Sequence, residues 1–306
     1  MSVKLKTRLR EEILSEIEKI RSNQTLLEEK NFNARLEAID YLEFHVIERL
    51  HVLMESRDIP GQMNVLKEYA QKVKDHLEEV NNKIFLFFRK KIQEGHKGKV
   101  LMELMDEYFD GNINAFIHQD ITGYDHLDIF LNGILTDQVP PGETKEREAE
   151  MVYYQKTPAR IILALIERAA FRSQDVFYDL GSGLGQVTIL VNLLSCVISK
   201  GVEFEPAFCI YAKTTTDNLY ISDVEFIHSD ARYTDYSSGT VFFMYSPFEG
   251  KMLLEVMQNL QGEAKKRRIR IFTYGPCSGE LAKKNWLIKE YGVRYSSGEF
   301  CEFRSV

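Results

Sequence analysis

Three glycines at alternate positions, Gly181, Gly183 and Gly185, follow the apolar run 176–180 and precede a second apolar run, 187–194. Such a turn lets the backbone pass close to a ligand, because no Cβ stands in the way. The flanking runs predict a buried parallel strand and the helix that packs back onto its sheet. In doubly wound sheets, ligands bind at turns that follow the carboxyl ends of strands. We therefore expect a ligand site here.

The chemistry of that ligand is indicated by Asp179, two positions before the first glycine. The dinucleotide fingerprint is G-x-G-x-x-G, whereas Gln186 stands here in the place of the third glycine. A carboxylate at the strand end would repel a pyrophosphate but would accept hydrogen bonds from an amino group, which makes a nucleotide-cofactor oxidoreductase the weaker alternative. S-adenosylmethionine has such a cationic end and no phosphate. Its expected contacts at the turn are Asp179, Gly181, Ser182, Gly183 and Gln186.

A second acid, Glu203, ends the predicted strand 196–203, about twenty residues after the turn, where ribose hydroxyls would lie. Glu205 opens the next helix, with Pro206 at an early position where its missing N–H costs nothing. Glu205 is therefore either a rival for the ribose or a favourable charge at a helix N-terminus. We favour Glu203.

A third acid, Asp230, is followed by Ala231 and comes after the predicted strand 224–228. In this architecture an acid at that place can accept a hydrogen bond from the adenine amino group. Taken alone, Asp230 fits a turn aspartate equally well. We include both residues in the expected cofactor site.

The chain's 306 residues exceed the usual length of one compact domain, so two units are expected. Apolar residues recur at helical spacing through the first part, in three stripes with breaks at Ser22, near residues 31–33 and at residues 59–61. The predicted division is a helical bundle over 1–112, a linker or lid over 113–150 and the cofactor-binding domain over 151–306. The stripes beginning at Leu5, Leu36 and Val65 are expected to form the bundle core.

Charge and composition exclude several classes of protein. Residues 1–150 carry 21 Lys and Arg against 29 Asp and Glu, whereas nucleic-acid binders usually present a basic face. No apolar run reaches the length of a membrane span, and no signal-peptide core is present, so we expect a cytoplasmic protein without membrane contact. The four cysteines show no C-x-x-C spacing, which predicts reduced core residues and no metal site. They are Cys196, Cys209, Cys277 and Cys301.

The segment from Tyr154-Gln-Lys-Thr157 through Phe177-Tyr-Asp-Leu-Gly-Ser-Gly-Leu-Gly-Gln-Val to Gly201-Val-Glu203 resembles the non-SET histone-lysine methyltransferases, the disruptor-of-telomeric-silencing type. This family belongs to the class I S-adenosylmethionine-dependent methyltransferases, and the resemblance covers roughly residues 150 to 250. It implies that Tyr154 and Thr157 approach the methionine end of the cofactor. It also implies cofactor contacts for Asp179, Gly181, Gly183, Gln186, Glu203 and Asp230.

The sequence departs from that family after the predicted fourth strand, 241–244. The histone enzymes place an asparagine there, and many amino-methylating relatives have Asn/Asp-Pro-Pro-Tyr/Phe, whereas this chain has Tyr245-Ser246-Pro247-Phe248. We expect Tyr245 and Ser246 to orient the methyl acceptor, with Tyr154 closing the other side. An amine acceptor must be neutral to attack, and no side chain is evident as its base.

Together these features predict an α/β fold: a Rossmann-like seven-stranded class I methyltransferase sheet with an N-terminal all-α helical bundle. The expected reaction is in-line methyl transfer from S-adenosylmethionine to a nucleophile, foremost an amine such as a protein lysine. The alternative is a non-catalytic S-adenosylmethionine-binding or scaffold protein that uses the bundle for interaction. The acceptor, a protein or a small molecule, and the oligomeric state stay open.

Overall fold

The computed structural model describes residues 3–55, 61–109, 113, 123–295 and 298–306. The chain divides into two compact units, residues 1–88 with 104–113, and residues 89–103 with 114–306. The second unit thus includes a stretch that precedes the predicted boundary at 112. The boundaries expected from the sequence stay predictions.

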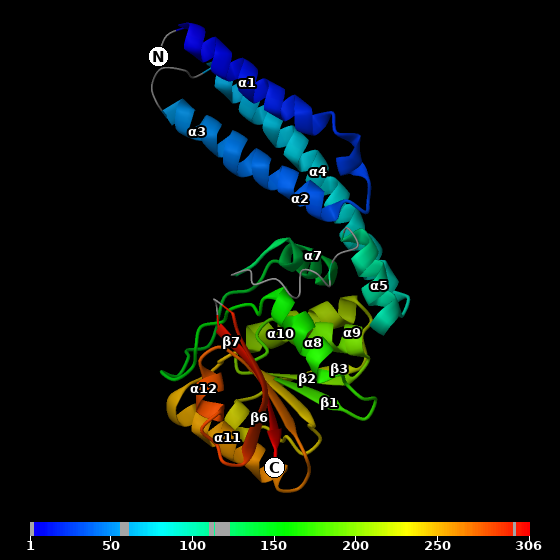
Figure 1. Ribbon diagram of the computed structural model, residues 1–306, viewed down its shortest axis with the longest axis vertical. Helices are drawn as coiled ribbons and strands as arrows, with labels where there is room; N and C mark the ends of the chain where they lie inside the picture. The colour runs from blue at the N-terminus through cyan, green and yellow to red at the C-terminus, as the bar shows by residue number, and fades with distance from the viewer. Residues whose placement is uncertain (1–2, 56–60, 110–112, 114–122, 296–297) are drawn as a thin grey trace. The chain divides into compact units, whose positions relative to one another are not determined.

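Unit 1 is a bundle of helices, as the three apolar stripes predict. Its elements lie lengthwise beside one another in Figure 1. They are α1 (Val3–Arg21), the short 3₁₀ turn η1 (Gln24–Leu27), α2 (Phe32–Asp40), the π-helical turn η2 (Tyr41–Ile47), α3 (Glu48–Glu55) and the greater part of α4 (Gly61–Gln93). The long helix α4 continues into unit 2, and α5 (Gly98–Tyr108) is likewise divided between the units.

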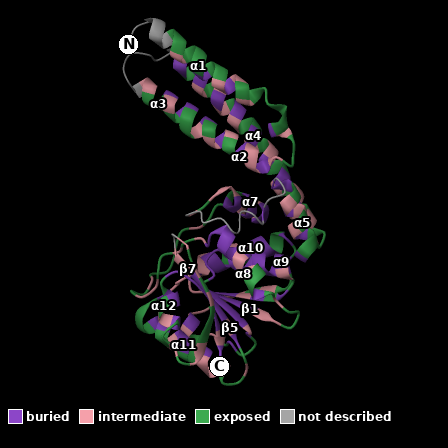
Figure 2. Ribbon diagram, viewed as in Figure 1, coloured by how far each residue is buried: buried purple, intermediate pink, exposed green. Residues whose placement is uncertain are grey.

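The buried face of the bundle follows the predicted periodicity with one correction. Ile13, Ile17 and Leu36 are buried as expected, and Figure 2 shows the buried stripes along the helices. Val65, expected in the third stripe, is 64% exposed, and Leu66 takes the core position instead. Because one residue turns a helix by about 100°, a shift of one position moves a side chain off the core face.

In the described part of unit 2, seven strands form one sheet in the order β3-β2-β1-β4-β5-β7-β6. The strands β1 to β5 pair in parallel, and β7 is antiparallel to both β5 and β6. This mixed order confirms the predicted Rossmann-like sheet. The strands are β1 (Val176–Leu180), β2 (Ile198–Glu203), β3 (Val224–His228), β4 (Val241–Met244), β5 (Arg270–Tyr274), β6 (Leu287–Tyr295) and β7 (Gly298–Ser305).

Helices cover both faces of this sheet, which suits the largely apolar residues of the central strands β1 and β4. The helices α8 (Ala159–Ala169), α9 (Gln186–Ser195) and α10 (Pro206–Asn218) cover one face in Figure 1, and α11 (Gly250–Ala264) and α12 (Cys277–Leu281) cover the other. Alternate residues of β1 serve the two faces: Tyr178 and Leu180 pack in the core under α11, whereas Phe177 and Asp179 face the opposite layer.

The start of α8 is held by α7 (His126–Leu135), which corrects one local prediction. The sequence predicts Thr157 as the N-cap of this helix and Pro158 as its first residue. In the structure Pro158 is at the N-cap position, and Asp128 Oδ1 accepts the hydrogen bond from Ala159 N at 2.8 Å. Asp128 also completes a capping box with Asp125 at the start of α7. One buried carboxylate therefore joins the starts of both helices.

The cysteines depart in one case from their predicted burial. Cys209, Cys277 and Cys301 are buried, whereas Cys196 is exposed at the end of α9, in a left-handed conformation. Within the described residues, no group of three or more His, Cys, Asp or Glu side chains is arranged to hold a metal ion. No helix among these residues is long and apolar enough to cross a membrane.

Candidate functional site

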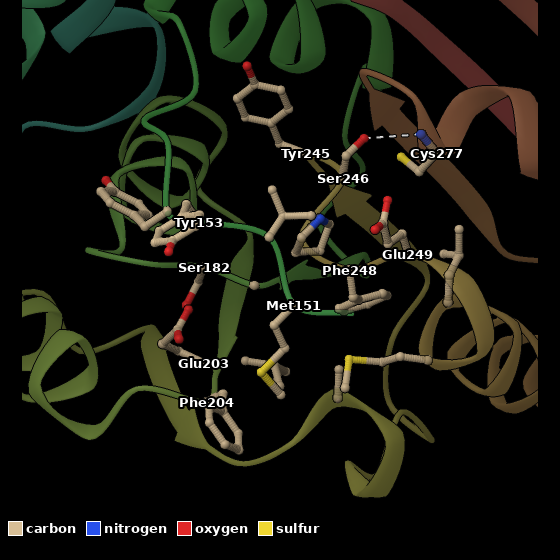
Figure 3. A pocket seen from close by; sticks show the side chains of 18 of the residues that line it. Met151, Tyr153, Ser182, Glu203, Phe204, Tyr245, Ser246, Phe248, Glu249 and Cys277 are labelled. Carbon is tan, nitrogen blue, oxygen red and sulfur yellow. Dashed lines mark hydrogen bonds between the residues drawn. The ribbon is translucent and has the colours of Figure 1, made fainter. Parts of the chain in front are cut away.

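A cavity of about 860 Å³ lies at the carboxyl ends of the parallel strands of unit 2. This volume is within the usual range for small-molecule sites. The predicted site residues that line it are Tyr154, Thr157, Asp179, Gly181, Ser182, Gln186, Glu203, Asp230, Ala231, Tyr245 and Ser246. Gly183 is the predicted residue that does not line the cavity. Figure 3 shows part of the lining from close by.

The glycine turn after β1 is needed for close approach as well as for conformation. Gly181 and Gly183 have φ angles of 78° and 53°, which side-chain-bearing residues rarely adopt. A Cβ on Gly181 would lie 2.3 Å from Pro247 Cβ, and one on Gly183 would lie 2.1 Å from Tyr154 Cε2. Gly183 therefore supports the cavity from behind the Tyr154 ring.

Asp179 is buried at the end of β1, where its Oδ2 accepts a hydrogen bond from Thr188 Oγ1 at 2.9 Å. Burial raises the pKa of this carboxyl to about 7, and the nearby charge of Glu203 adds to the rise. A cation bound beside this carboxylate would stabilise its ionised form and so counteract the rise in pKa caused by burial and by Glu203. The site is therefore chemically suited to the ammonium group of an amino-acid moiety.

Two buried side chains beside Asp179 lack partners in the described protein. The hydroxyl of Ser182 and both amide atoms of Gln186 make no hydrogen bond. Buried polar groups in folded proteins are nearly always paired, so such atoms in a cavity wall indicate where polar ligand atoms belong. A ligand with an amino acid and a ribose provides donors and acceptors for both residues, which fits S-adenosylmethionine.

Glu203 and Glu205 have separate tasks. Glu203 receives hydrogen bonds from Gly183 N at 2.7 Å and from Glu205 N at 2.8 Å, and its carboxylate lines the cavity at the end of β2. Glu205 is the N-cap of α10 and also accepts from Thr144 and from Lys145 N. Burial acts to raise the pKa of Glu205, but these hydrogen bonds outweigh it and lower the pKa to about 2.

Asp230 lines the cavity beyond Glu203, but its carboxylate is already engaged. It accepts from Arg232 Nη2 at 2.6 Å, and the same guanidinium nitrogen contacts Glu148 at 2.6 Å. Burial acts to raise the pKa of Asp230, and the bonds to Arg232 outweigh it, so that the pKa is lowered. The predicted adenine contact would thus be made by a carboxylate that Arg232 keeps ionised and oriented.

Residues 143–152, which we call the strap, run along the cavity and were not recognised as site residues by sequence. Besides the bonds to Glu205 and Arg232, the strap is held where Val152 N donates to Pro247 O at 3.0 Å. Glu150 of the strap accepts from the first N–H groups of α11. Strap residues in the lining are Glu143, Arg147, Met151 and Val152.

Two aromatic residues of the lining were also missed by sequence reasoning. Phe204 directly follows Glu203, and the strap's Lys145 Nζ lies 3.5 Å from the centre of its ring. Phe248 is buried after β4. The position of Phe204, one residue beyond the ribose acid, was the signal that could have revealed it, because a ring there can stack on an adenine.

The far end of the cavity lies at the turn after β4. Ser246, in the left-handed region at φ 39°, donates its hydroxyl to Tyr274 O at 3.1 Å and accepts from Cys277 N at 3.1 Å. This hydroxyl therefore joins the β4 turn to the start of α12 (Figure 3). The Tyr245 ring packs 4.7 Å from the Tyr274 ring, and burial raises the pKa of Tyr245 to about 12. Tyr245 is consequently a neutral phenol at physiological pH.

Tyr154 and Thr157 lie between the two ends. Thr157 is buried in the lining, and the Tyr154 ring lies 5.3 Å from the ring of Phe208. Burial raises the pKa of Tyr154, so that its hydroxyl also stays protonated. The assigned roles of these residues in binding and catalysis stay predictions.

Residues 146–241 match the model of the family described as histone methylation protein DOT1. No curated protein is similar enough to the chain to count as a match. Solved structures that resemble it include an RNA methyltransferase from Salinibacter ruber in complex with S-adenosyl-L-homocysteine, with 21% identity over 49% of this chain and 94% of that chain, at a TM-score of 0.42. Another is a SAM-dependent methyltransferase from Aquifex aeolicus, with 15% identity over 49% of this chain and 94% of that chain, at a TM-score of 0.40.

These structural likenesses are weak, and the sheet order remains the basis of the fold assignment. The family match covers the strap from residue 146 onward, the glycine turn and the acids Glu203, Glu205 and Asp230, and it ends at the first residue of β4. It confirms the resemblance predicted from the motif, and with it S-adenosylmethionine as the cofactor. Over residues 146–241, the chain resembles the DOT1-type class I S-adenosylmethionine-dependent methyltransferases.

Proposed function

We propose that this protein transfers the methyl group of S-adenosylmethionine to an amine nitrogen of a protein or small-molecule acceptor. One observation carries the proposal: a single cavity joins the acids at the ends of β1, β2 and β3 with the turn after β4. A bound cofactor and an acceptor could therefore meet within it. A pocket that enclosed only the cofactor, without reaching the turn after β4, would suit a non-catalytic binding protein equally well.

The charge of the lining supports an amine in preference to an anionic acceptor. Among the described residues of the cavity, seven carboxylates face one guanidinium, that of Arg147. Arg147 is itself held by Glu143 and lies over the Tyr153 ring. Such a field attracts cations and repels phosphates. The carboxylates are Glu143, Asp179, Glu203, Glu205, Asp230, Glu249 and Glu280.

The chain's own residues would act mainly by positioning the cofactor and the acceptor. Asp179 would hold the cofactor's ammonium, Glu203 the ribose hydroxyls and Asp230 the adenine amino group. The cofactor supplies an electrophilic methyl on a positively charged sulfur. Tyr154 and the turn at Tyr245 would confine the acceptor nitrogen to the line of attack, and such confinement can be worth about 7–11 kcal/mol of a bimolecular barrier.

The first experiment is calorimetric titration with S-adenosylmethionine and S-adenosylhomocysteine, with NAD as the control. We expect saturable binding of both sulfur ligands and none of NAD. Glu203→Ala and Gly183→Arg should each weaken binding by at least tenfold, since the first removes the ribose acceptor and the second displaces Tyr154. Unchanged affinity in folded variants would show that the cofactor lies elsewhere.

Turnover separates the proposed enzyme from a non-catalytic binding protein. Cell extract is incubated with the protein and S-adenosylmethionine labelled in the methyl group, and the labelled product is then hydrolysed. We expect methylated amines in the hydrolysate. Saturable cofactor binding with no transfer to any extract component would instead favour the binding role.

A further inference from the structure

The acceptor end of the cavity holds one carboxylate that differs from all the others in the lining. Glu249 follows the turn after β4 and comes directly before α11. Its side chain is exposed and lies in the wall of the cavity (Figure 3). Among the described lining residues, it is the carboxylate with no hydrogen-bond or ion-pair partner. Each of the other six is engaged within the protein.

Glu249 has no partner among the described residues because Glu150 of the strap caps the start of α11 in its place. Glu249 occupies the N-cap position, yet its own side chain makes no capping bond. Glu150 of the strap accepts from Lys251 N at 3.0 Å and from Met252 N at 2.7 Å instead. An N-cap side chain normally accepts these bonds itself. Because Glu150 satisfies the helix, the Glu249 carboxylate is left for the cavity.

The surroundings of Glu249 suit a cation carried on an apolar stem. Leu253 and Leu254 of α11 line the same end, and the neutral Tyr245 ring stands at the β4 turn. Aromatic rings attract ammonium groups through their faces. Glu280, the other carboxylate at this end, forms an exposed ion pair with Lys283 Nζ at 2.6 Å.

We propose that Glu249 recognises the acceptor, binding the ammonium form of a primary alkylamine before transfer. This inference rests on the proposed function and assigns its substrate-facing residue. The bound ammonium then loses a proton to solvent water, and the neutral nitrogen attacks the sulfonium methyl. The N–C bond forms as the C–S bond breaks, S-adenosylhomocysteine leaves as a neutral thioether, and the methylated amine carries the positive charge.

The test measures acceptor binding separately from turnover. The protein is saturated with S-adenosylhomocysteine and titrated, by ligand-observed NMR, with Nα-acetyl-lysine N-methylamide. The matched neutral ligand is Nα-acetyl-norleucine N-methylamide, which has the same stem without the ammonium. We expect the wild-type protein to prefer the ammonium ligand, and Glu249→Gln to weaken its binding roughly fivefold while leaving the neutral ligand unaffected.

Glu255→Gln is the matched control, because it removes the same charge from the same helix. Glu255 does not line the cavity and pairs with Lys251 at the surface. This variant should keep the ammonium preference, and both variants should bind S-adenosylhomocysteine as the wild type does. An ammonium preference that survives in Glu249→Gln, or one that is missing from the wild-type protein, overturns the inference. Failure of the wild type to bind S-adenosylhomocysteine at all would overturn the proposed function as well.

Discussion

Asp179 has a pKa of about 7 because it is buried beside a second carboxylate, and this links cofactor binding to pH. A ligand ammonium favours the ionised form of Asp179, so the pKa of this carboxyl is lower in the complex than in the free protein. The ligand therefore binds the deprotonated protein more tightly. The unliganded fold, in contrast, holds the proton more tightly than the unfolded chain does. The unliganded protein should therefore lose stability as the pH rises from about 4 through about 7.

From this linkage we predict a pH optimum for cofactor affinity. The dissociation constant of S-adenosylhomocysteine should rise about tenfold for each unit below pH 6, where Asp179 is protonated before binding, and should rise again above about pH 8 as the ligand's α-ammonium deprotonates. Calorimetry across pH 5–9 measures it. Asp179→Asn should bind weakly and lose the acidic limb of the profile. An acidic limb that persists in this variant would assign the linkage to another group.

At the scale of elements, the glycine turn and the strap determine the shape of the site. The turn brings the end of β1 against the turn after β4, since Gly181 leaves no room for a Cβ beside Pro247. The strap lies along the same edge and is held by Glu205 at the N-cap of α10, by Arg232 of η3 (Ala231–Tyr233) and by the start of α11. Neither element is rigid by itself, and each depends on side chains from other parts of the chain.

Close packing at the turn predicts a large effect of one methyl group. Gly181→Ala should lower the free energy of unfolding by about 1–3 kcal/mol and weaken cofactor binding, because the new Cβ must displace Pro247. Gly262→Ala is the control: this glycine lies in α11, with nothing within 4 Å of an added Cβ, and should gain about 0.5–1 kcal/mol. Urea denaturation measures both, and an equal response from the two variants would contradict the predicted contact.

The strap anchor at Glu205 predicts a kinetic effect. Its Oε2 accepts from both Thr144 N and Lys145 N, and an amide in its place supplies one acceptor oxygen where two now act. Glu205→Gln should therefore loosen the strap and speed S-adenosylhomocysteine dissociation several-fold in stopped-flow experiments. Glu146→Gln, an exposed substitution within the same strap, should leave the rate unchanged. Equal rates for wild type and Glu205→Gln would mean that the strap does not control ligand exchange.

At the scale of the whole molecule, the chain has two compact units with separate cores. The cavity and all the predicted site residues belong to residues 114–306. Ligand binding should therefore stabilise one unit and leave the other largely unaffected, because a ligand contributes stability only where it binds the folded state.

This separation predicts two thermal transitions in calorimetry. S-adenosylhomocysteine at a hundred times its dissociation constant should stabilise one of them by about 2.7 kcal/mol. Ile17→Ala, which empties a fully buried position of the bundle, should destabilise the other by about 2–5 kcal/mol without changing ligand affinity. A single transition that responds to both changes would show that the two units unfold together.

The sequence alone predicted the fold class and the residues that we propose to hold the cofactor. The strand β1, the glycine turn and the acid Glu203 are close in the chain. Their spacing could be interpreted because strands and turns have the same local geometry in every protein. The Rossmann-like class of the sheet was also predicted, whereas its strand order comes from the structure. The predicted strands at 224–228 and 241–244 coincide with β3 and β4.

Only the tertiary structure decided which acids are free. By sequence Glu205 competed with Glu203, and nothing distinguished Glu249 from its neighbours. The bonds from Thr144 to Glu205 and from α11 to Glu150 join residues 61 and about 100 positions apart. Whether a carboxylate is free to bind a ligand depends on such distant partners, and residue type and spacing do not reveal them. For that reason the proposed cofactor contacts, and Tyr245 and Ser246 at the acceptor end, could be predicted from local motifs, whereas Glu249 could be singled out only in the fold.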